Sequence, residues 1–167
     1  MMETHRLIFR QYTMEDLDFL MTMTSDSEVM KYIGKGVIWS ELETIEKLKR
    51  FINCYSNEEG IGLMLAIRKE DGKLVGHAGL VSQLVEDKQE TEIGYWISKE
   101  FWGHGFAKES AIGWRDVGFE KLKKNKLISL IQYENKPSIQ VAINNGMEYE
   151  REVKFNSKSI ALYSIER

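Results

Sequence analysis

Apolar positions along the chain follow two different spacings, and the changes between them divide the sequence into strands and helices. Apolar runs of strand length cover residues 6–10, 62–69, 73–82, 89–98, 127–133, 149–155 and 159–165. Apolar residues at helical spacing follow Thr13, Ser40, Gly105 and Asn135. An Asp71-Gly72 turn joins two of the runs, which indicates a hairpin. This mixture of elements predicts an α/β domain.

The stretch 92–108 joins an apolar strand to a helix through a turn that contains Gly103 and Gly105. The first N–H groups of a helix have no partner inside it and lie at the positive end of its dipole, so they can bind an anion. No Ser, Thr, Asp or Asn stands at the cap position, and Lys108 places a cation where the dipole alone disfavours one. Both features favour a bound anion.

The stricter nucleotide-binding motifs are absent from this turn. A dinucleotide fingerprint requires a third glycine where the chain has Lys108, and no Gly-Lys-Ser/Thr string of a P-loop occurs. A Gly-x-Gly sequence without its flanks fits an ordinary turn equally well. The flanking residues therefore decide the interpretation.

Three segments, in this order, resemble the GNAT acetyltransferase family. They are Glu92-Ile-Gly-Tyr, Phe101-Trp-Gly-His-Gly-Phe-Ala-Lys-Glu-Ser110 and Glu134-Asn-Lys-Pro-Ser-Ile-Gln-Val-Ala-Ile-Asn-Asn-Gly146-Met. The opening His5-Arg-Leu-Ile-Phe-Arg10 is similar to the first strand of the RimJ/RimL branch, named for ribosomal-protein N-terminal acetyltransferases. The resemblance spans nearly the whole chain. It implies the GNAT fold: a mixed, mostly antiparallel twisted sheet with a splayed central strand pair and flanking helices, in one domain over residues 1–167.

The resemblance also implies that acetyl-CoA is the acetyl donor. Its diphosphate is expected on the glycine turn and its pantetheine arm along the strand that contains Gly94, since glycine inside a strand marks a bulge or a close approach by a ligand. Main-chain N–H groups of that strand are suited to stabilise the oxyanion. The residues expected to bind the cofactor are Tyr95, Trp96, Ile97, Trp102, Gly103, His104, Gly105, Phe106, Ala107, Lys108, Asn135 and Ser138.

Two side chains are candidates for the catalytic chemistry. Glu92 is the first candidate to accept the proton of the attacking amine, directly or through water, and Glu90 is the second; the alternative is a carboxylate bonded to neighbouring main chain. Many GNAT enzymes place a tyrosine near the leaving thiolate, at a position that is Ala142 here. The RimJ/RimL resemblance implies that Ser138 takes that place, with a hydrogen bond to helix main chain as its alternative role.

The implied reaction is direct attack by a primary amine in a ternary complex. The branch favours a protein N-terminal α-amine, while small-molecule amines are the other acceptor class. Deprotonation at pH 7 costs about 1.4 kcal/mol for an α-amine and roughly 4.6 kcal/mol for a lysine. A non-catalytic coenzyme A-binding module is an alternative because the tyrosine is missing, and a phosphate-binding or nucleotide-hydrolysing protein is a third reading.

Composition is that of an ordinary globular domain and excludes several other classes. The 167 residues are 43% hydrophobic and 29% charged, with a formal net charge of −3, so the chain has no general attraction to nucleic acid or anionic membranes. A single cysteine, Cys54, excludes an internal disulfide, and no cluster has metal-ligand spacing. No apolar run approaches the length of a membrane span. We expect a cytoplasmic monomer or homodimer that binds no metal.

Four further features carry predictions that the fold can test. The apolar loop 32–39 is either a buttress over the core or one wall of the acceptor pocket. Cys54 is predicted to be buried or half-buried, and His77 to pack within the sheet. Four lysines follow the long helix: Lys121, Lys123, Lys124 and Lys126. We expect them to form a solvated helix end, where cations suit the helix dipole. Alternatively, one of them contacts the 3′-phosphate of the cofactor.

Overall fold

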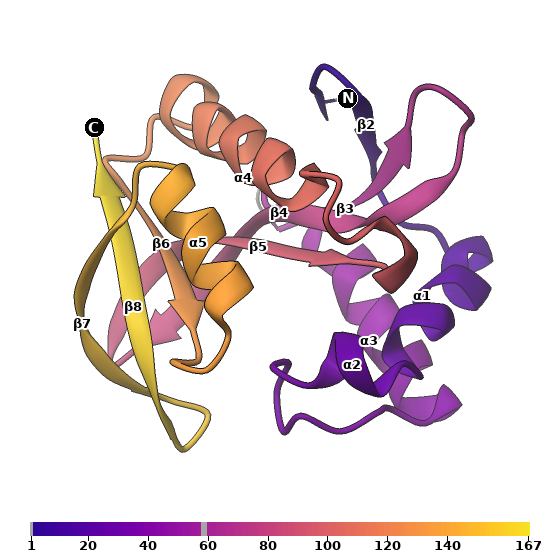
Figure 1. The fold of residues 1–167 in the computed structure, drawn as a ribbon, viewed down its shortest axis with the longest axis horizontal. Coiled ribbons are helices and arrows are strands. Elements are labelled where there is room, and N and C mark those ends of the chain that lie inside the picture. Colours follow the sequence, from indigo (N-terminus) through magenta and orange to yellow (C-terminus); the bar gives the residue numbers. More distant parts are fainter. Residues whose placement is uncertain (1, 58–59) are drawn as a thin grey trace.

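One mixed sheet organises the chain in the computed structural model, which describes residues 2–57 and 60–167 (Figure 1). Its eight strands lie in the order β1-β2-β3-β4-β5-β6-β8-β7. They are β1 (Met2–Glu3), β2 (Leu7–Arg10), β3 (Gly62–Arg68), β4 (Leu74–Val85), β5 (Lys88–Ile97), β6 (Lys126–Ile131), β7 (Glu148–Phe155) and β8 (Lys158–Glu166). Only β5 and β6 pair in parallel among the described strands. The predicted α/β fold with a mostly antiparallel sheet is confirmed.

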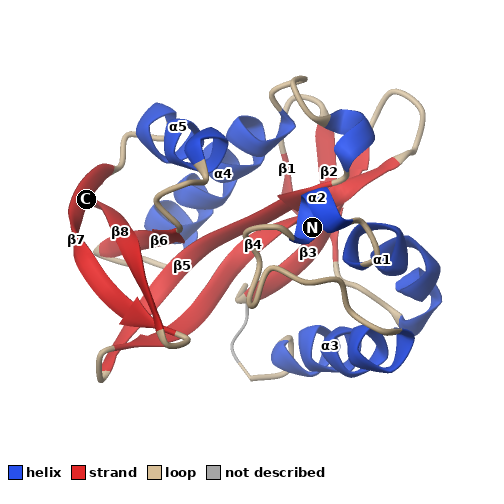
Figure 2. Cartoon of the chain, turned by 60° about the horizontal axis from the view of Figure 1, so that its bottom comes forward, coloured by secondary structure: helices blue, strands red, loops and turns tan. Residues whose placement is uncertain are grey.

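Helices cover both faces of this sheet, with α4 and α5 on one side and α1 to α3 on the other (Figures 1 and 2). Their bounds are α1 (Leu17–Thr24), α2 (Ser27–Met30), α3 (Glu41–Cys54), α4 (Phe106–Asp116) and α5 (Lys136–Asn144). Short 3-10 turns cover Met14–Asp16 and Lys99–Phe101, and a π-helical turn, Val117–Lys121, extends α4.

Strand β5 lies between two hydrophobic cores because its side chains alternate between the faces of the sheet. Ile93 and Ile97 are buried in the core beneath α4 and α5, and Tyr95 packs against the same core. Trp96 points to the opposite core, under α1 and α3. A single strand therefore contributes side chains to both sides of the molecule.

Strands β5 and β6 separate soon after they meet. Their one register pair within the described chain is Glu92 with Ile128. By contrast, β4 and β5 pair continuously through Gly94 without a register shift. The prediction of a β-bulge at this glycine is therefore wrong. The opening arises on the other edge of β5, from which β6 diverges beyond Ile128 while it remains paired with β8. The splayed central strand pair is confirmed, and it leaves the edge of β5 that faces β6 without a strand partner beyond Glu92.

Two predictions about single side chains have opposite outcomes. Cys54 is exposed, contrary to the prediction, because the stripe of α3 that faces the core runs through Leu48, Phe51 and Ile52. His77 is fully buried as predicted, with its Nδ1 atom 2.9 Å from the Tyr12 hydroxyl. Burial lowers the pKa of this imidazole to about 3, so it is neutral at physiological pH.

Candidate active site

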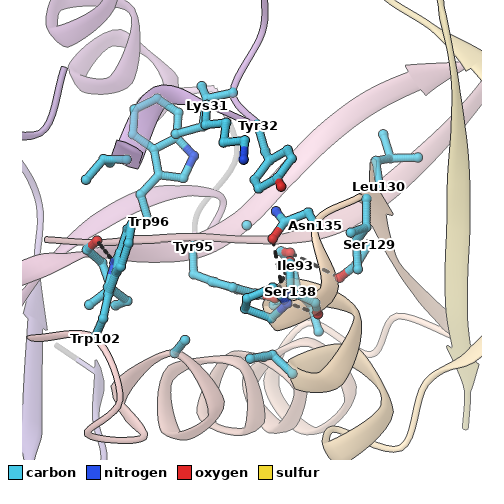
Figure 3. A pocket seen from close by; sticks show the side chains of 18 of the residues that line it. Lys31, Tyr32, Ile93, Tyr95, Trp96, Trp102, Ser129, Leu130, Asn135 and Ser138 are labelled. Carbon is cyan, nitrogen blue, oxygen red and sulfur yellow. Dashed lines mark hydrogen bonds between the residues drawn. The ribbon is translucent and has the colours of Figure 1, made fainter. Parts of the chain in front are cut away.

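A cavity of about 480 Å³ occupies the gap between β5 and β6 (Figure 3). Its walls come from α2 and the residues after it, from β5, from β6 and from the first turns of α5. Eight of the predicted cofactor or catalytic residues line it: Glu92, Tyr95, Trp96, Ile97, Trp102, Ala107, Asn135 and Ser138. Segments far apart in the sequence thus meet at the point where the sheet opens.

The glycine turn lies between Trp102 and Ala107, which both line the cavity. Gly103 and Gly105 have φ angles of 78° and 81°, in the left-handed region that favours glycine. Gly105 is the N-cap of α4, and no side chain caps the helix. The first-turn N–H groups are therefore free of a side-chain acceptor, as the sequence predicted, and fit a negatively charged group.

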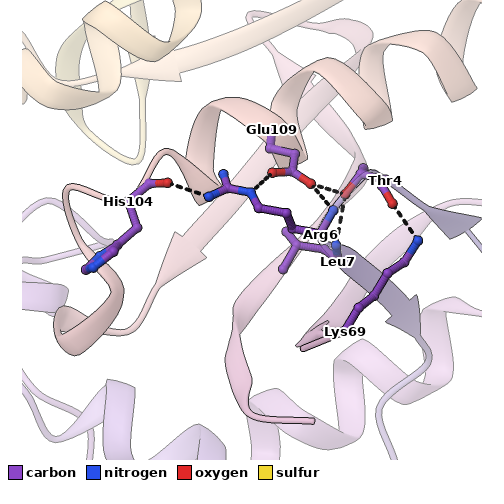
Figure 4. A network of polar contacts seen from close by, with 6 residues as sticks. All are labelled: Thr4, Arg6, Leu7, Lys69, His104 and Glu109. Atoms are coloured by element: carbon purple, nitrogen blue, oxygen red, sulfur yellow. Dashed lines mark hydrogen bonds and ion pairs between the residues drawn. The ribbon is translucent and has the colours of Figure 1, made fainter. Parts of the chain in front are cut away.

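A polar network fixes this turn to the start of the chain (Figure 4). The Arg6 guanidinium donates to the His104 carbonyl at 3.0 Å and to the Glu109 carboxylate at 2.7 Å, and it lies over the Phe106 ring. Thr4 and the Arg6 main chain donate to the same carboxylate at 2.6 and 2.7 Å. Burial opposes ionisation of Glu109, but these hydrogen bonds outweigh it and hold its pKa below the usual value.

Five predicted cofactor residues of the turn do not line the cavity directly: Gly103, His104, Gly105, Phe106 and Lys108. The imidazole of His104 is exposed and lies 2.9 Å from the Trp102 carbonyl, while Lys108 is exposed and Phe106 is buried beneath the turn. The Trp102 indole donates to the Ile97 carbonyl at 2.7 Å, which ties the turn to the end of β5.

Glu92 lines the cavity, and its carboxylate is also bonded to protein groups. It accepts hydrogen bonds from the Gln83 amide at 2.8 Å and from the Leu130 N–H at 3.4 Å, so the main-chain contact that was its alternative role is present. Burial raises the pKa of Glu92 to about 7, while these two hydrogen bonds act in the opposite direction. The group therefore titrates near neutral pH, as a general base requires.

Glu90, the second candidate base, lies outside the cavity. Its carboxylate is buried and pairs with Lys88 at 3.2 Å and Lys126 at 3.8 Å. Glu90 shares the face of Glu92 but precedes the point where β5 and β6 separate, so no space opens beside it. Lys126 also pairs with Glu150 at 2.7 Å, so it belongs to this buried cluster and not to a solvated helix end.

Ser138 and Asn135 project from the start of α5 into the cavity. The Asn135 side chain accepts from the Ser138 N–H at 3.4 Å and so caps the helix. The Ser138 hydroxyl lies 2.8 Å from the Tyr95 hydroxyl, which also donates to the Ser138 carbonyl at 3.2 Å. From the sequence, Tyr95 was expected to act through its main-chain N–H alone. The contact between its side chain and Ser138 was not predicted.

The loop after α2 contributes one wall of the cavity. Tyr32 and Ile33 line it, and the Tyr32 hydroxyl donates to the Glu134 carbonyl at 3.2 Å. Trp39 instead packs against Trp96 with 5.6 Å between the ring centroids. Both predicted roles of the loop are therefore present in different residues, whereas Val37 and Ile38, 57% and 52% exposed, have neither role.

No group of three or more His, Cys, Asp and Glu side chains within residues 2–57 and 60–167 is arranged to hold a metal ion. No helix in the described part of the chain is long and apolar enough to cross a membrane.

Comparison with known proteins identifies the family. The model of the acetyltransferase (GNAT) domain matches residues 6–148. The chain is 33% identical to the uncharacterized protein YkkB of Bacillus subtilis over 142 residues, which cover 83% of this chain and 79% of that protein. It is 32% identical to the uncharacterized N-acetyltransferase YnaD of Bacillus subtilis, with 88% and 82% covered. A GNAT-family acetyltransferase structure from Bacillus anthracis matches with a TM-score of 0.82 and 26% identity over 99% and 97% of the chains.

The chain therefore belongs to the GNAT acetyltransferase family, and it is an acetyl-CoA-dependent N-acetyltransferase. The narrower RimJ/RimL resemblance is one of several. A ribosomal L7/L12 acetyltransferase, RimL, in complex with coenzyme A matches with a TM-score of 0.79 and 16% identity over 98% and 95% of the chains. A spermidine N-acetyltransferase from Vibrio cholerae in complex with coenzyme A and spermine matches with 0.75 and 17% over 96% and 95%. These two likenesses show the fold alone.

Proposed function

We propose that the enzyme transfers an acetyl group from acetyl-CoA directly to a primary amine in a ternary complex, and that a protein N-terminal α-amine is the favoured acceptor. The observation that carries this proposal is the cavity at the splayed strands β5 and β6. It adjoins an uncapped helix at its α4 end and the aromatic loop residue Tyr32 at the other. Donor and acceptor can thus approach the same point from opposite faces of the sheet.

The donor is held largely by main chain in this proposal. The N–H groups from Gly103 to Lys108 bind the diphosphate, which the absence of a side-chain cap on α4 supports. The pantetheine arm lies along β5 beyond Glu92, where the departure of β6 leaves the strand edge open. The Asn135 amide, which lines the cavity at the start of α5, contributes a further hydrogen bond.

The reaction requires three groups at the end of the arm. The amine nitrogen attacks the thioester carbonyl, and a β5 N–H among Tyr95 to Ile97 stabilises the oxyanion. Glu92 accepts the amine proton, directly or through water, and its pKa of about 7 suits that role. The carbon–sulfur bond then breaks, and the Ser138 hydroxyl donates a hydrogen bond to the departing thiolate.

Charge at the cavity favours a peptide α-amine over a polyamine. Glu28, an acidic group of the lining, is in an ion pair with Lys99. Lys31 also lines the cavity, and its ammonium nitrogen lies 5.1 Å from the centroid of the Tyr32 ring. Glu92 is partly protonated at neutral pH. The acceptor side therefore offers little negative charge to a polycation, and a base of this pKa is sufficient for an α-amine.

A turnover screen tests the proposal. Acetyl-CoA is incubated with peptides of varied N-terminal residue, polyamines, amino acids and aminoglycosides, and release of free thiol is followed, with product mass identifying the acetylated nitrogen. We expect the highest kcat/KM with a peptide α-amine. A higher kcat/KM with a polyamine or aminoglycoside would refute the acceptor assignment, and no turnover with any amine would refute the proposed reaction.

A further inference from the structure

The Tyr95 side chain has a contact that the proposed reaction does not yet use. Its hydroxyl lies 2.8 Å from the Ser138 hydroxyl, on the side of β5 that faces α4 and α5 (Figure 3). The two residues are 43 positions apart in the sequence and come from different elements, β5 and α5. Both line the cavity. A phenol thus reaches the serine although the helix position where many family members carry a tyrosine is Ala142.

The direction of this hydrogen bond decides what Ser138 can do. If Ser138 donates to Tyr95, its only proton is used and none is left for a ligand. If Tyr95 donates to Ser138, the serine hydrogen is free to point into the cavity. The phenol oxygen of Tyr95 lies 2.8 Å from the Ser138 hydroxyl oxygen and 3.2 Å from the Ser138 carbonyl oxygen. Both acceptor oxygens belong to Ser138, so the single phenol proton can be shared between the carbonyl and the hydroxyl in a bifurcated hydrogen bond, which leaves the serine proton free.

We infer that Tyr95 is a positioning residue, which donates to the Ser138 oxygen and so orients the serine O–H toward the sulfur of the leaving thiolate. This inference rests on the proposed function, because it assigns a role to the same cavity. No proton leaves Tyr95: the proton of the amine goes to Glu92, and the thiolate is protonated by water after release.

The surroundings of Tyr95 keep it in the donating form. Burial, acting more strongly than the hydrogen bond with Ser138, raises the pKa of Tyr95 to about 12. The phenol is therefore protonated at every pH at which the enzyme is expected to work. Its ring packs in the core beneath α4 and α5, which fixes the hydroxyl relative to the start of α5.

A double-mutant cycle tests this coupling. Tyr95→Phe, Ser138→Ala and the double variant are compared with the wild type for kcat, KM for acetyl-CoA and Kd for coenzyme A. We expect Tyr95→Phe to lower kcat about 5- to 10-fold with KM and Kd unchanged, and to cause no further loss once Ser138 is replaced. Tyr149→Phe is the matched control, since its hydroxyl contacts Tyr133 at 3.4 Å outside the cavity, and it should change nothing.

A second readout does not require turnover. The thiol of bound coenzyme A is titrated by its thiolate absorbance, and a donor aimed at the sulfur lowers the pKa of that thiol. We expect the thiol pKa to rise equally in Tyr95→Phe and Ser138→Ala. A kcat loss from Tyr95→Phe that is the same in both serine backgrounds, or a thiol pKa unchanged by Tyr95→Phe, would overturn the inference. If the thiol pKa responds as expected but no amine is acetylated, the positioning role stands and the proposed reaction fails.

Discussion

The two sides of β5 serve the cavity by different means. On the side of α4 and α5, the fit to the donor comes from main chain: a helix start without a cap, two glycines in the left-handed region and an open strand edge. On the side of α1 to α3, the walls are side chains from separate segments, such as Tyr32, Trp96 and Glu92. A cofactor shared by a family can be held by a constant main chain, whereas the acceptor is selected by side chains that differ between members.

Replacement of Glu92 gives the largest expected effect on the acceptor side. Glu92→Gln keeps the shape and the hydrogen-bond capacity but cannot accept the amine proton. We expect kcat at pH 8 to fall roughly 100-fold, while the Kd for acetyl-CoA is unchanged. In the wild type, kcat/KM should rise with pH through about 7, and this inflection should be absent in the variant. A kcat within 3-fold of the wild type would limit Glu92 to a structural role.

The same group also affects stability, with a sign that follows from its raised pKa. The native protein binds the Glu92 proton up to about pH 7 and the unfolded chain only up to about 4.5, so wild-type stability declines as pH rises between these values. Glu92→Gln lacks this dependence. The difference in the free energy of unfolding, variant minus wild type, should therefore increase by about 2 kcal/mol between pH 5 and pH 8. Urea denaturation at the two pH values measures this difference. A difference that is constant with pH would show that the carboxylate is not desolvated.

The glycine turn provides the corresponding test on the donor side. Gly105→Ala adds a side chain at a φ of 81° and displaces the first amides of α4, so we expect the Kd for acetyl-CoA to rise about 10-fold with little change in kcat. Gly72→Ala is the matched control, because Gly72 has a φ of 72° in the hairpin between β3 and β4, and a Cβ there meets nothing within 4 Å. Both variants should lose similar stability. Equal weakening of acetyl-CoA binding in both would trace the effect to stability and not to the site.

The smallest effect is expected from charge at the acceptor wall. Lys31→Glu reverses the sign of an exposed side chain that lines the cavity, and should raise kcat/KM for a polyamine about 2- to 5-fold relative to a peptide α-amine. Lys35→Glu makes the same charge change in the same loop outside the cavity lining. An equal response to both substitutions would mean that only the overall charge of the protein matters.

The sequence predicted the parts of the site that depend on local rules. The uncapped helix after Gly105 and the helix that begins after Asn135 follow from neighbouring residues, and each is confirmed. Contacts between distant segments were not predictable in this way. Arg6 and Glu109 are 103 positions apart, and nothing in either segment alone indicates the ion pair.

The place where space opens could not be predicted locally. Gly94 was expected to mark a bulge or a close approach by a ligand, but β5 pairs with β4 without a register shift, and its other edge opens where β6 diverges, which is a property of the whole sheet. Glu90 shares the face of Glu92 as periodicity indicated, yet it lies outside the cavity because the strands separate only beyond Glu92. Local pattern thus locates an element and its faces, while topology decides where space opens beside it.

A crystal structure with coenzyme A and a peptide bound is the most direct test of the central claim. The account predicts the diphosphate within hydrogen-bond distance of main-chain N–H groups between Gly103 and Lys108, the pantetheine arm on the free edge of β5, and the sulfur beside Ser138. A coenzyme bound at another surface, or amides of the turn already paired with protein groups, would contradict it.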